Sequence, residues 1–499
     1  MSRMKPASAL SLLTLLAVLV SGFYLANFLS EREVVQGNWT ARRAALSFAD
    51  RLRQTSDDLT RMVRLYAVNG DPVYREYFDE ILAIRNGEAP RPADYFSVPY
   101  WDIVLNTGER FGDDGPAVPI RTLASEAGLL EEELAEISKA EDASNALAVI
   151  ENEIMEIVAT QIGASDGDYV LEGEALDAML RLHGPDYFAA KAQVMTHLVE
   201  LGRKVDQSFG ELRPQVISFY DQGLRNGVIL LAATLVLVAL EFLVNRRSLP
   251  AAGRARILAI LAALLSMVGV LFSLTSVANF QRERPTISRN ISARLAARSF
   301  ADNLRQTSDD LTLMVRLYAI NGDPLYRSYF DEILDIRNGI EPRPEKYFDV
   351  PYWDIVLDTG ERTGEAGEAV AIRTRAGNAG LTEGEFAEFI RAEDASNALA
   401  EIENEIMDVV AAQIDASGGD YALEGEALQA MLRLHGPEYH AAKAQVMQPL
   451  VELERKVEEA YVTWIDAVIE FNDQSLNLGV YTLAAAFLLT LAGVWLRRR

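Results

Sequence analysis

The fold is decided by a short sequence that occurs twice, as Gln54-Thr-Ser-Asp-Asp-Leu59 and as Gln306-Thr-Ser-Asp-Asp-Leu311. The two occurrences lie 252 residues apart, and the same offset aligns the flanking sequence without a gap. Ser47–Arg110 and Ser299–Arg362 are identical at 52 of 64 positions, and the register continues through Glu141–Leu147. A repeat of this length indicates a tandem duplication of a whole domain.

Within each copy the apolar residues recur at helical spacing. One stripe steps by 4, 3, 4 and 3 residues and consists of Ala143, Leu147, Ile150, Ile154 and Ile157. Such steps place side chains on one face of a helix, whereas no convincing β alternation is present. The sequence therefore predicts an all-α protein in which each copy is a long antiparallel helical bundle.

Glycine and proline set the expected helix boundaries. A helix over 42–68 should stop at Asn69-Gly70-Asp71-Pro72, because Gly permits positive φ and the residue before Pro is pushed out of the helical region. A shorter helix over 73–84 should follow. A third should run from near Pro185 to Val244. The segment that contains Pro90, Pro92 and Pro99 should be irregular and should bury its aromatic rings.

Four uncharged runs are candidates for membrane spans, namely Ala9–Phe28, Gly227–Leu240, Ile257–Phe280 and Leu476–Leu496. With a small extension of the second, each is long enough to cross roughly 30 Å of hydrocarbon. The first could instead be a cleaved signal peptide, but its apolar run is longer than usual for one and lacks a clear cleavage site. Arginine and lysine residues flank the runs on the side that the positive-inside rule assigns to the cytoplasm.

These features predict an integral membrane protein of two tandem copies, each with a span, an extracytoplasmic bundle and a second span. We therefore expect a multi-pass protein of the bacterial inner membrane whose large domains are periplasmic. The expected segments are a cytoplasmic N-terminus (1–7), four spans (8–28, 224–244, 257–280 and 476–496), copy 1 (29–223), a cytoplasmic linker (245–256), copy 2 (281–475) and a cytoplasmic C-terminus (497–499).

Composition excludes several classes of function. The chain has 73 acidic and 47 basic residues, a net charge of -26, which argues against nucleic-acid binding through a basic face. It has no cysteine, so disulfides, thiolate nucleophiles and iron–sulfur clusters are excluded. No nucleophile–base arrangement, phosphate-binding glycine loop or metal-ligand cluster is present, so we expect no enzyme, no cofactor and no metal site.

The candidate ligand-binding residues are aromatic and polar groups near the irregular segment. They are Tyr66, Tyr77, Arg85, Asn86, Tyr100, Trp101 and Asp102, with Tyr318, Tyr329, Arg337, Asn338, Tyr352, Trp353 and Asp354 in copy 2. Aromatic walls with an arginine could hold a small anionic or amphipathic ligand. The alternative is structural: the rings pin the loop against the bundle, and Arg85 caps a helix C-terminus.

Other charged groups have plainer interpretations. Ser56-Asp57-Asp58 is expected to form a solvated or salt-bridged face, because neighbouring carboxylates on a helix diverge and do not converge on one ion. His183 and His435 precede Gly-Pro, where a capping or packing role is favoured over a pH or metal response. Glu131 should begin a helix. Glu241 should snorkel or pair with Asn245 or Arg247.

The combined motifs resemble a known class of domain. Gln-Thr-Ser-Asp-Asp-Leu-Thr, Asn-Gly-Asp-Pro-x-Tyr, Ile-Arg-Asn-Gly and Pro-Tyr-Trp-Asp, followed by Glu438–Met447, are similar to all-helical periplasmic sensor regions of bacterial transmembrane receptors. Such regions occur in chemoreceptors, sensor histidine kinases and diguanylate cyclases. Copy 1 departs from the pattern, with Phe188 where copy 2 has His440. The chain also ends after three arginines without a signalling module, so either it is truncated or it senses without its own output.

The resemblance implies signal transduction by a sensor or receptor. A small ligand or a protein partner in the periplasm would bias the bundle, and a helix shift would pass through the four spans and the lipid bilayer to a separate signalling partner. The alternative is a non-sensing membrane scaffold that binds an envelope protein. Since two-span receptors commonly act as homodimers, the fused copies could form a pseudo-dimer within one chain, or the chain could form a homo-oligomer.

Overall fold

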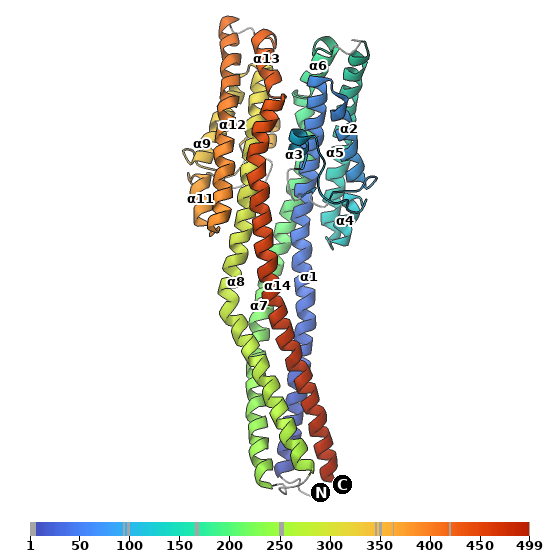
Figure 1. Ribbon diagram of the computed structural model, residues 1–499, viewed down its shortest axis with the longest axis vertical. Helices are drawn as coiled ribbons and strands as arrows, with labels where there is room; N and C mark the ends of the chain where they lie inside the picture. Colours follow the sequence, from blue (N-terminus) through green and yellow to red (C-terminus); the bar gives the residue numbers. More distant parts are fainter. Residues whose placement is uncertain are drawn as a thin grey trace. The chain divides into compact units, whose positions relative to one another are not determined.

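The computed structural model describes residues 6–92, 95–96, 100–164, 169–248, 254–344, 347–348, 352–362, 364–418 and 421–498. These residues form fourteen helices and no strand (Figure 1). In copy 1 the helices are α1 (Pro6–Asn69), α2 (Pro72–Asn86), α3 (Tyr100–Thr107), α4 (Ile120–Glu126), α5 (Glu131–Ala164), α6 (Gly173–Arg181) and α7 (Pro185–Ser248). In copy 2 they are α8 (Arg254–Asn321), α9 (Pro324–Asn338), α10 (Tyr352–Thr359), α11 (Ile372–Asn378), α12 (Glu383–Ala416), α13 (Gly425–Arg433) and α14 (Pro437–Arg498). The all-α prediction is confirmed.

The chain divides into two compact units. Unit 1 consists of Met1–Thr40, Phe209–Ile291 and Ala460–Arg499, and unit 2 consists of Ala41–Ser208 and Ser292–Glu459. Each copy contributes to both units, because the long helices α1, α7, α8 and α14 contain residues of both.

The predicted break between the first two helices is confirmed, although α1 begins at Pro6 and not near residue 42. Helix α1 ends at Asn69, and Gly70 has a φ of 66°. A Cβ atom at Gly70 would lie 2.5 Å from the Tyr169 ring, so both the backbone angle and the space require glycine there. Helix α2 begins at Pro72, is capped by the Asp71 side chain on the Val73 amide, and ends before Gly87 in the left-handed conformation.

In unit 2 copy 1 and copy 2 lie side by side (Figure 1). One apolar core contains residues of both copies, including Leu59 and Met62 of α1 and Leu311 and Met314 of α8. The copies also touch directly, since the Asn69 side-chain amide donates to the His435 carbonyl at 3.4 Å. The irregular segment after α2 contains a short helix that the sequence did not predict, α3, and an isolated bridge pairs Pro92 with Asp114.

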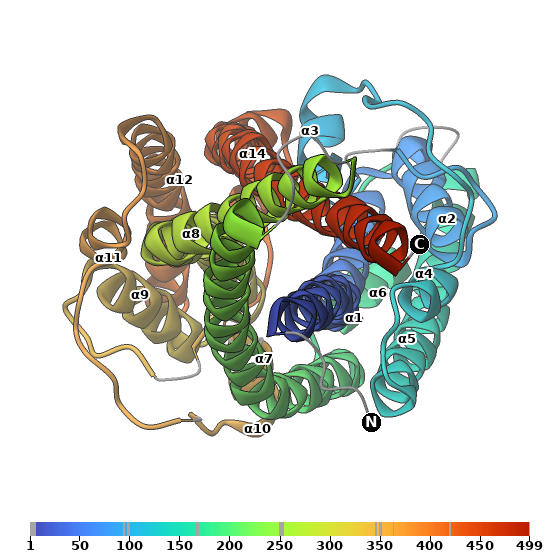
Figure 2. The ribbon, with the colours of Figure 1, turned by 90° about the horizontal axis from the view of Figure 1, so that it is seen from below.

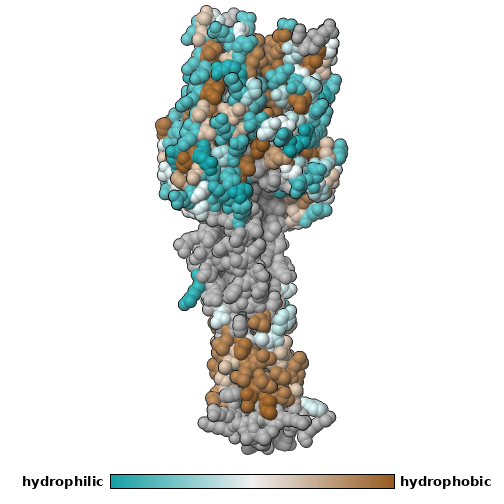
Figure 3. All heavy atoms as spheres, viewed as in Figure 1, coloured by the Kyte–Doolittle hydropathy of each residue, from teal (hydrophilic) through white to brown (hydrophobic). Residues whose placement is uncertain are grey.

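Unit 1 contains the first part of α1, the last part of α7, the first part of α8 and the last part of α14. These four helices lie next to one another in Figure 2. Its buried side chains include Val18, Leu231, Val238, Val270 and Leu483. The surface of its described part is rich in hydrophobic residues, whereas hydrophilic residues dominate the visible face of unit 2 (Figure 3).

The membrane prediction is contradicted. Among the described residues, none of the helices has a stretch that is both long and apolar enough to span a membrane. The expected integral-membrane class and inner-membrane location are therefore wrong on this finding. Some side chains of the apolar runs pack against one another, such as Val18 and Leu231, whereas others, such as Leu16 and Phe23, are exposed. Buried hydroxyl groups interrupt the runs, and Ser21 and Thr234 hydrogen bond across the helices at 2.8 Å.

Candidate functional site

A polar cavity of about 90 Å³ lies between copy 1 and copy 2 within unit 2. Its walls come from α1, α3 and α7 of copy 1 and from α8, α10 and α14 of copy 2. The basic lining residues are Arg53, Arg61, Arg64, Lys191, Arg316 and Lys443, and the acidic ones are Asp57, Asp102, Asp309, Asp310 and Asp354. A cavity of this size and polarity is large enough to hold several water molecules or a small ligand.

Many of the charged lining residues lie on one face of α1 and on the equivalent face of α8. Arg53, Asp57, Thr60 and Arg64 are separated by 4, 3 and 4 residues, which places them in one row along a helix. The apolar residues beside that row, such as Leu59, enter the core. Both sides of this segment of α1 are consequently buried, one in apolar packing and one against the other copy.

Four of the six basic residues have a carboxylate partner within 4.0 Å, and the partner of Arg53 is Asp50, at 3.7 Å. Lys191 lies 2.8 Å from Asp57, and Lys443 lies 2.8 Å from Asp309. Arg61 lies 2.6 Å from Asp102. It also approaches Asp309 of the other copy at 3.9 Å. The basic groups Lys443, Arg61 and Arg305 outweigh burial and lower the pKa of Asp309 to about 2, so this carboxylate is charged at neutral pH.

Arg64 and Arg316 are different, because neither forms an ion pair with a described carboxylate, although the charge of Glu151 acts on Arg64 and that of Glu403 acts on Arg316. Their exposed fractions are 5% and 9%, and no carboxylate of the described residues lies within 4.0 Å of either guanidinium. The Nε atom of each is buried without a hydrogen-bond partner among those residues, although Arg64 Nη2 donates to the Leu182 carbonyl at 3.3 Å. Burial, together with the charges of Arg64 and Arg61, lowers the pKa of Arg316 to about 10. Both arginines therefore remain positively charged at neutral pH.

Three of the chain's four histidines lie near these arginines. Burial, followed by the charge of Arg64, lowers the pKa of His183 well below 6.5. Burial and the charge of Arg316 do the same for His435. His440, which lines the cavity, has its pKa lowered to about 4 by burial, Arg316 and Arg61. The rings are neutral at pH 7, so they add no further positive charge.

Buried acids complete the surroundings. Burial raises the pKa values of Asp58 and Asp310 well above the usual value. Behind the cavity wall, Tyr187 donates to the Glu151 carboxylate at 2.6 Å, and Thr60 donates to the same oxygen at 3.1 Å. Burial raises the pKa of Glu151 to about 7 despite these hydrogen bonds. These raised pKa values reduce the negative charge near Arg64 and Arg316, so the nearby acids do not fully neutralise the two guanidiniums.

Two of the fourteen candidate residues from the sequence, Asp102 and Asp354, line the cavity. The aromatic candidates are buried in the apolar core, and the indole of Trp101 donates to the Tyr95 hydroxyl at 3.0 Å. Arg85 is also buried and donates to Ser144 at 2.8 Å. It packs against α5 instead of facing a ligand. Asn86 and Asn338 are exposed. The structure therefore places the candidate residues in the core, at the surface and, for Asp102 and Asp354, at the cavity.

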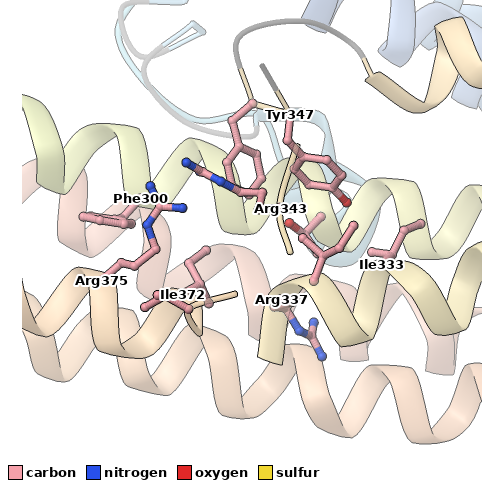
Figure 4. A pocket seen from close by; sticks show the side chains of 11 residues that line it. Phe300, Ile333, Arg337, Arg343, Tyr347, Ile372 and Arg375 are labelled. Atoms are coloured by element: carbon pink, nitrogen blue, oxygen red, sulfur yellow. The ribbon is translucent and has the colours of Figure 1, made fainter. Parts of the chain in front are cut away.

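A second hollow lies beside some of these residues in copy 2, and Figure 4 shows its lining side chains. It measures only about 10 Å³, which is room for about one water molecule. Arg337 points away from Tyr347 and donates to Ser396 of α12 at 2.9 Å. This hollow is too small for the ligand expected there.

The segment from Ser56 to Asp58 is more buried than its sequence predicts. The solvated face is wrong, because Ser56 and Asp58 have exposed fractions of 1% and 5%. The salt-bridge part of the interpretation agrees with the structure, since Arg61 lies 3.8 Å from Asp58. The arginine and lysine residues that line the cavity, and His440, are not among the ligand-binding residues that the sequence predicts. One feature of the sequence could have indicated this burial. The charged residues of this helix form a single row with apolar residues on both sides, so the helix has little polar surface to expose.

The remaining assignments are simple. The packing role of His183 and His435 is confirmed by their burial, and α5 begins at Glu131 as predicted. Glu241 is buried, but its proposed partners, Asn245 and Arg247, have side chains outside the described part of the structure.

Comparison with known proteins gives no relative: no protein-family model, curated protein or solved structure matches this chain.

Proposed function

We propose that this chain is a ligand-responsive sensor that binds a small anion in the cavity between its two copies. The proposal rests on one observation, the pair Arg64 and Arg316. A guanidinium cannot lose its proton at neutral pH, and a buried charge without a partner costs several kcal/mol. Two such groups from equivalent positions of facing copies form a site in which an anion supplies the missing charge and hydrogen-bond acceptors.

The position of the pair supports a sensory role. Arg64 belongs to α1 of copy 1 and Arg316 to α8 of copy 2, so one bound anion contacts both copies. Without an anion the two positive charges repel each other, and with an anion they attract a common partner. The ligand therefore binds one spacing of α1 and α8 more tightly than another, which is the requirement for a population shift. Because α1 and α8 are helices of 64 and 68 residues, a shift of either one is carried along its length.

The first test measures binding through stability. The full-length protein is denatured in a low-chloride zwitterionic buffer with nitrate, sulfate, phosphate, acetate or propionate added at increasing concentration. An anion that binds only the folded protein raises the free energy of unfolding by about 2.7 kcal/mol at 100 times its Kd. The double variant Arg64→Met, Arg316→Met should lose this increase. Arg203→Met is the matched control, because Arg203 is exposed and pairs with Glu200 at 2.6 Å.

The second test measures the helix shift. The chain has no cysteine, so Asn86→Cys and Asn338→Cys introduce the only two thiols, one exposed on each copy. Spin labels on these thiols report the distance between the copies by pulsed electron resonance. We expect a saturable change in that distance with the stabilising anion and none in the arginine double variant. A stabilising anion that leaves the distance unchanged would reduce the proposal to simple binding, and the absence of any stabilising anion would refute it.

A further inference from the structure

The two halves of the cavity differ in charge at one position. When each lining residue is compared with the residue 252 positions away, the side chains agree at all positions but two. His440 of copy 2 corresponds to Phe188, and Arg61 of copy 1 corresponds to Leu313. The first pair adds no charge at neutral pH, because burial and nearby arginines lower the pKa of His440 to about 4. The second pair leaves copy 2 with one positive charge fewer than copy 1.

The missing charge leaves a carboxylate of copy 2 without an ion pair. In copy 1 the Arg61 guanidinium lies 2.6 Å from Asp102. The equivalent carboxylate of copy 2 is Asp354, which also lines the cavity. Leu313 takes the place of the arginine there, and no basic side chain of the described residues lies within 4.0 Å of Asp354. Asp354 is therefore an acceptor in the cavity wall that copy 2 does not neutralise.

A second carboxyl of copy 2 is affected in the same way. Asp310 corresponds to Asp58, which lies 3.8 Å from Arg61. The Oδ2 atom of Asp310 is buried and has no hydrogen-bond partner in the described part of the chain. Burial, followed by the charge of Asp354, raises the pKa of Asp310 well above its usual value. Asp310 and Asp354 therefore lie near each other, and both lack the cation that Arg61 provides in copy 1.

Two bases of copy 1 act on Asp354 without pairing with it. Burial raises the pKa of Asp354, and the charge of Lys191 opposes this shift, but the Lys191 ammonium forms its ion pair with Asp57 at 2.8 Å. Arg64 and Asp354 also act on each other, yet they form no ion pair within 4.0 Å. An arginine and a carboxylate without ion pairs thus line the same cavity with a gap between them.

We infer that the cavity binds one small zwitterion per chain. Its carboxylate accepts hydrogen bonds from Arg64 and Arg316, and its ammonium donates to Asp354. Asp310 is the second acceptor, since an ammonium has three N–H donors and replaces the guanidinium that copy 1 carries at the equivalent place. This inference rests on the proposed anion-binding function and adds the ligand class.

A zwitterion suits this lining better than an ion of either sign. A plain anion pairs with the arginines but brings no donor to Asp354 and places a second negative charge near it. A plain cation has the opposite fault at Arg64. The cavity of about 90 Å³ has room for about six to nine water-sized groups, which is enough for an amino acid of about five or six non-hydrogen atoms. In copy 1 Arg61 already occupies the position of the ammonium, so we expect one ligand per chain.

The test is calorimetric titration of the full-length protein with two matched pairs of ligands, glycine with acetate and β-alanine with propionate. Within each pair the ligands differ by the ammonium group alone. The buffer is a low-chloride piperazine sulfonate, whose molecules are too large for the cavity. We expect one zwitterion per chain. In at least one pair the zwitterion should bind about tenfold or more tighter than the matched acid, which is a usual effect of a hydrogen bond to a charged group.

Three variants test the partner of the ammonium. Asp354→Asn should weaken binding of the zwitterion about tenfold or more and should leave binding of the matched acid unchanged or tighter. Asp358→Asn is the matched control, because Asp358 is an exposed acid one turn further along α10 and copy 1 has Asn106 at this position. It should change neither affinity. Leu313→Arg supplies the base that copy 1 has, so it should remove the preference for the zwitterion.

The outcomes separate this inference from the proposed function. If acetate and propionate bind at least as tightly as glycine and β-alanine, the zwitterion inference is refuted while anion binding stands. The same holds if Asp354→Asn weakens the zwitterion and the matched acid equally, because that result indicates a structural role. If no ligand binds the wild-type protein, or if binding survives in the double variant Arg64→Met, Arg316→Met, both fail. The comparison of matched ligands uses the unmodified protein, so it decides the question even if Leu313→Arg does not fold.

Discussion

Replacing Arg316 by methionine should stabilise the anion-free protein. The change removes a buried positive charge and keeps an unbranched side chain of similar length. Burial and neighbouring charges lower the pKa of Arg316 from 12.5 to about 10. Each pKa unit corresponds to 1.36 kcal/mol, so the charged form is destabilised by about 3 kcal/mol relative to water. Replacing buried ionic groups by apolar ones commonly gains about 1 to 4 kcal/mol, which is consistent with this value.

The assay is urea denaturation at pH 7 in a low-chloride zwitterionic buffer, with the slope of the transition compared between proteins. We expect Arg316→Met to raise the free energy of unfolding by about 1 to 3 kcal/mol. Arg203→Met, which removes an exposed ion pair, should change it by less than about 0.5 kcal/mol. In the presence of a binding anion the order reverses, because only the wild-type protein gains stability from the ligand.

A loss of stability in the anion-free buffer would refute this reasoning. It would mean that groups of the protein already compensate the Arg316 charge, and the argument for an anion between the copies would lose its main support. A gain in stability that persists unchanged with every anion would show that the charge is uncompensated but that no ligand uses it.

Three further predictions concern the surroundings of the site. The folded-state pKa values of His183 and His435 lie below the unfolded value of 6.5, so the unfolded chain takes up protons first, and unfolding free energy should fall as pH drops below about 6.5; replacing both by phenylalanine should flatten that slope in urea titrations. Glu151 has the opposite sign: its folded pKa of about 7 exceeds the unfolded 4.5, so stability should fall as pH rises through that window, and Glu151→Gln should gain up to about 3 kcal/mol at pH 8. Trp101→Ala should cost about 3 to 5 kcal/mol because it empties a core position, with Trp353→Ala a matched measurement in copy 2; a cost below about 1 kcal/mol for either would contradict the packing role.

The elements of the fold could be predicted because their signals are local. The sequence from Asn69 to Pro72 ends one helix and begins the next by backbone geometry alone, and the structure shows both boundaries. The heptad-like stripe of α5 likewise depends only on spacing within one helix. The unpredicted helix α3 follows a proline-rich stretch, where the signals for a turn and for a short helix overlap.

The cavity could not be predicted, because it is formed by residues 252 positions apart in the sequence. A charged row such as Arg53, Asp57 and Arg64 is usually exposed, so the sequence alone favours a solvated face. Only the packing of copy 1 against copy 2 makes these residues internal. The position of the aromatic candidates could not be predicted for a related reason: a large ring suits a core as well as a pocket, and the surrounding elements decide between them.

The fusion of two copies into one chain permits the two halves of the cavity to differ. In a symmetric homodimer every lining residue occurs twice, so an arginine at position 61 would face its own copy across the two-fold axis, and a leucine there would replace both. In the fused chain Arg61 and Leu313 occupy equivalent positions independently. The lining has diverged at this pair and at the pair Phe188 and His440, and a homodimer of identical chains could not hold either difference within one cavity.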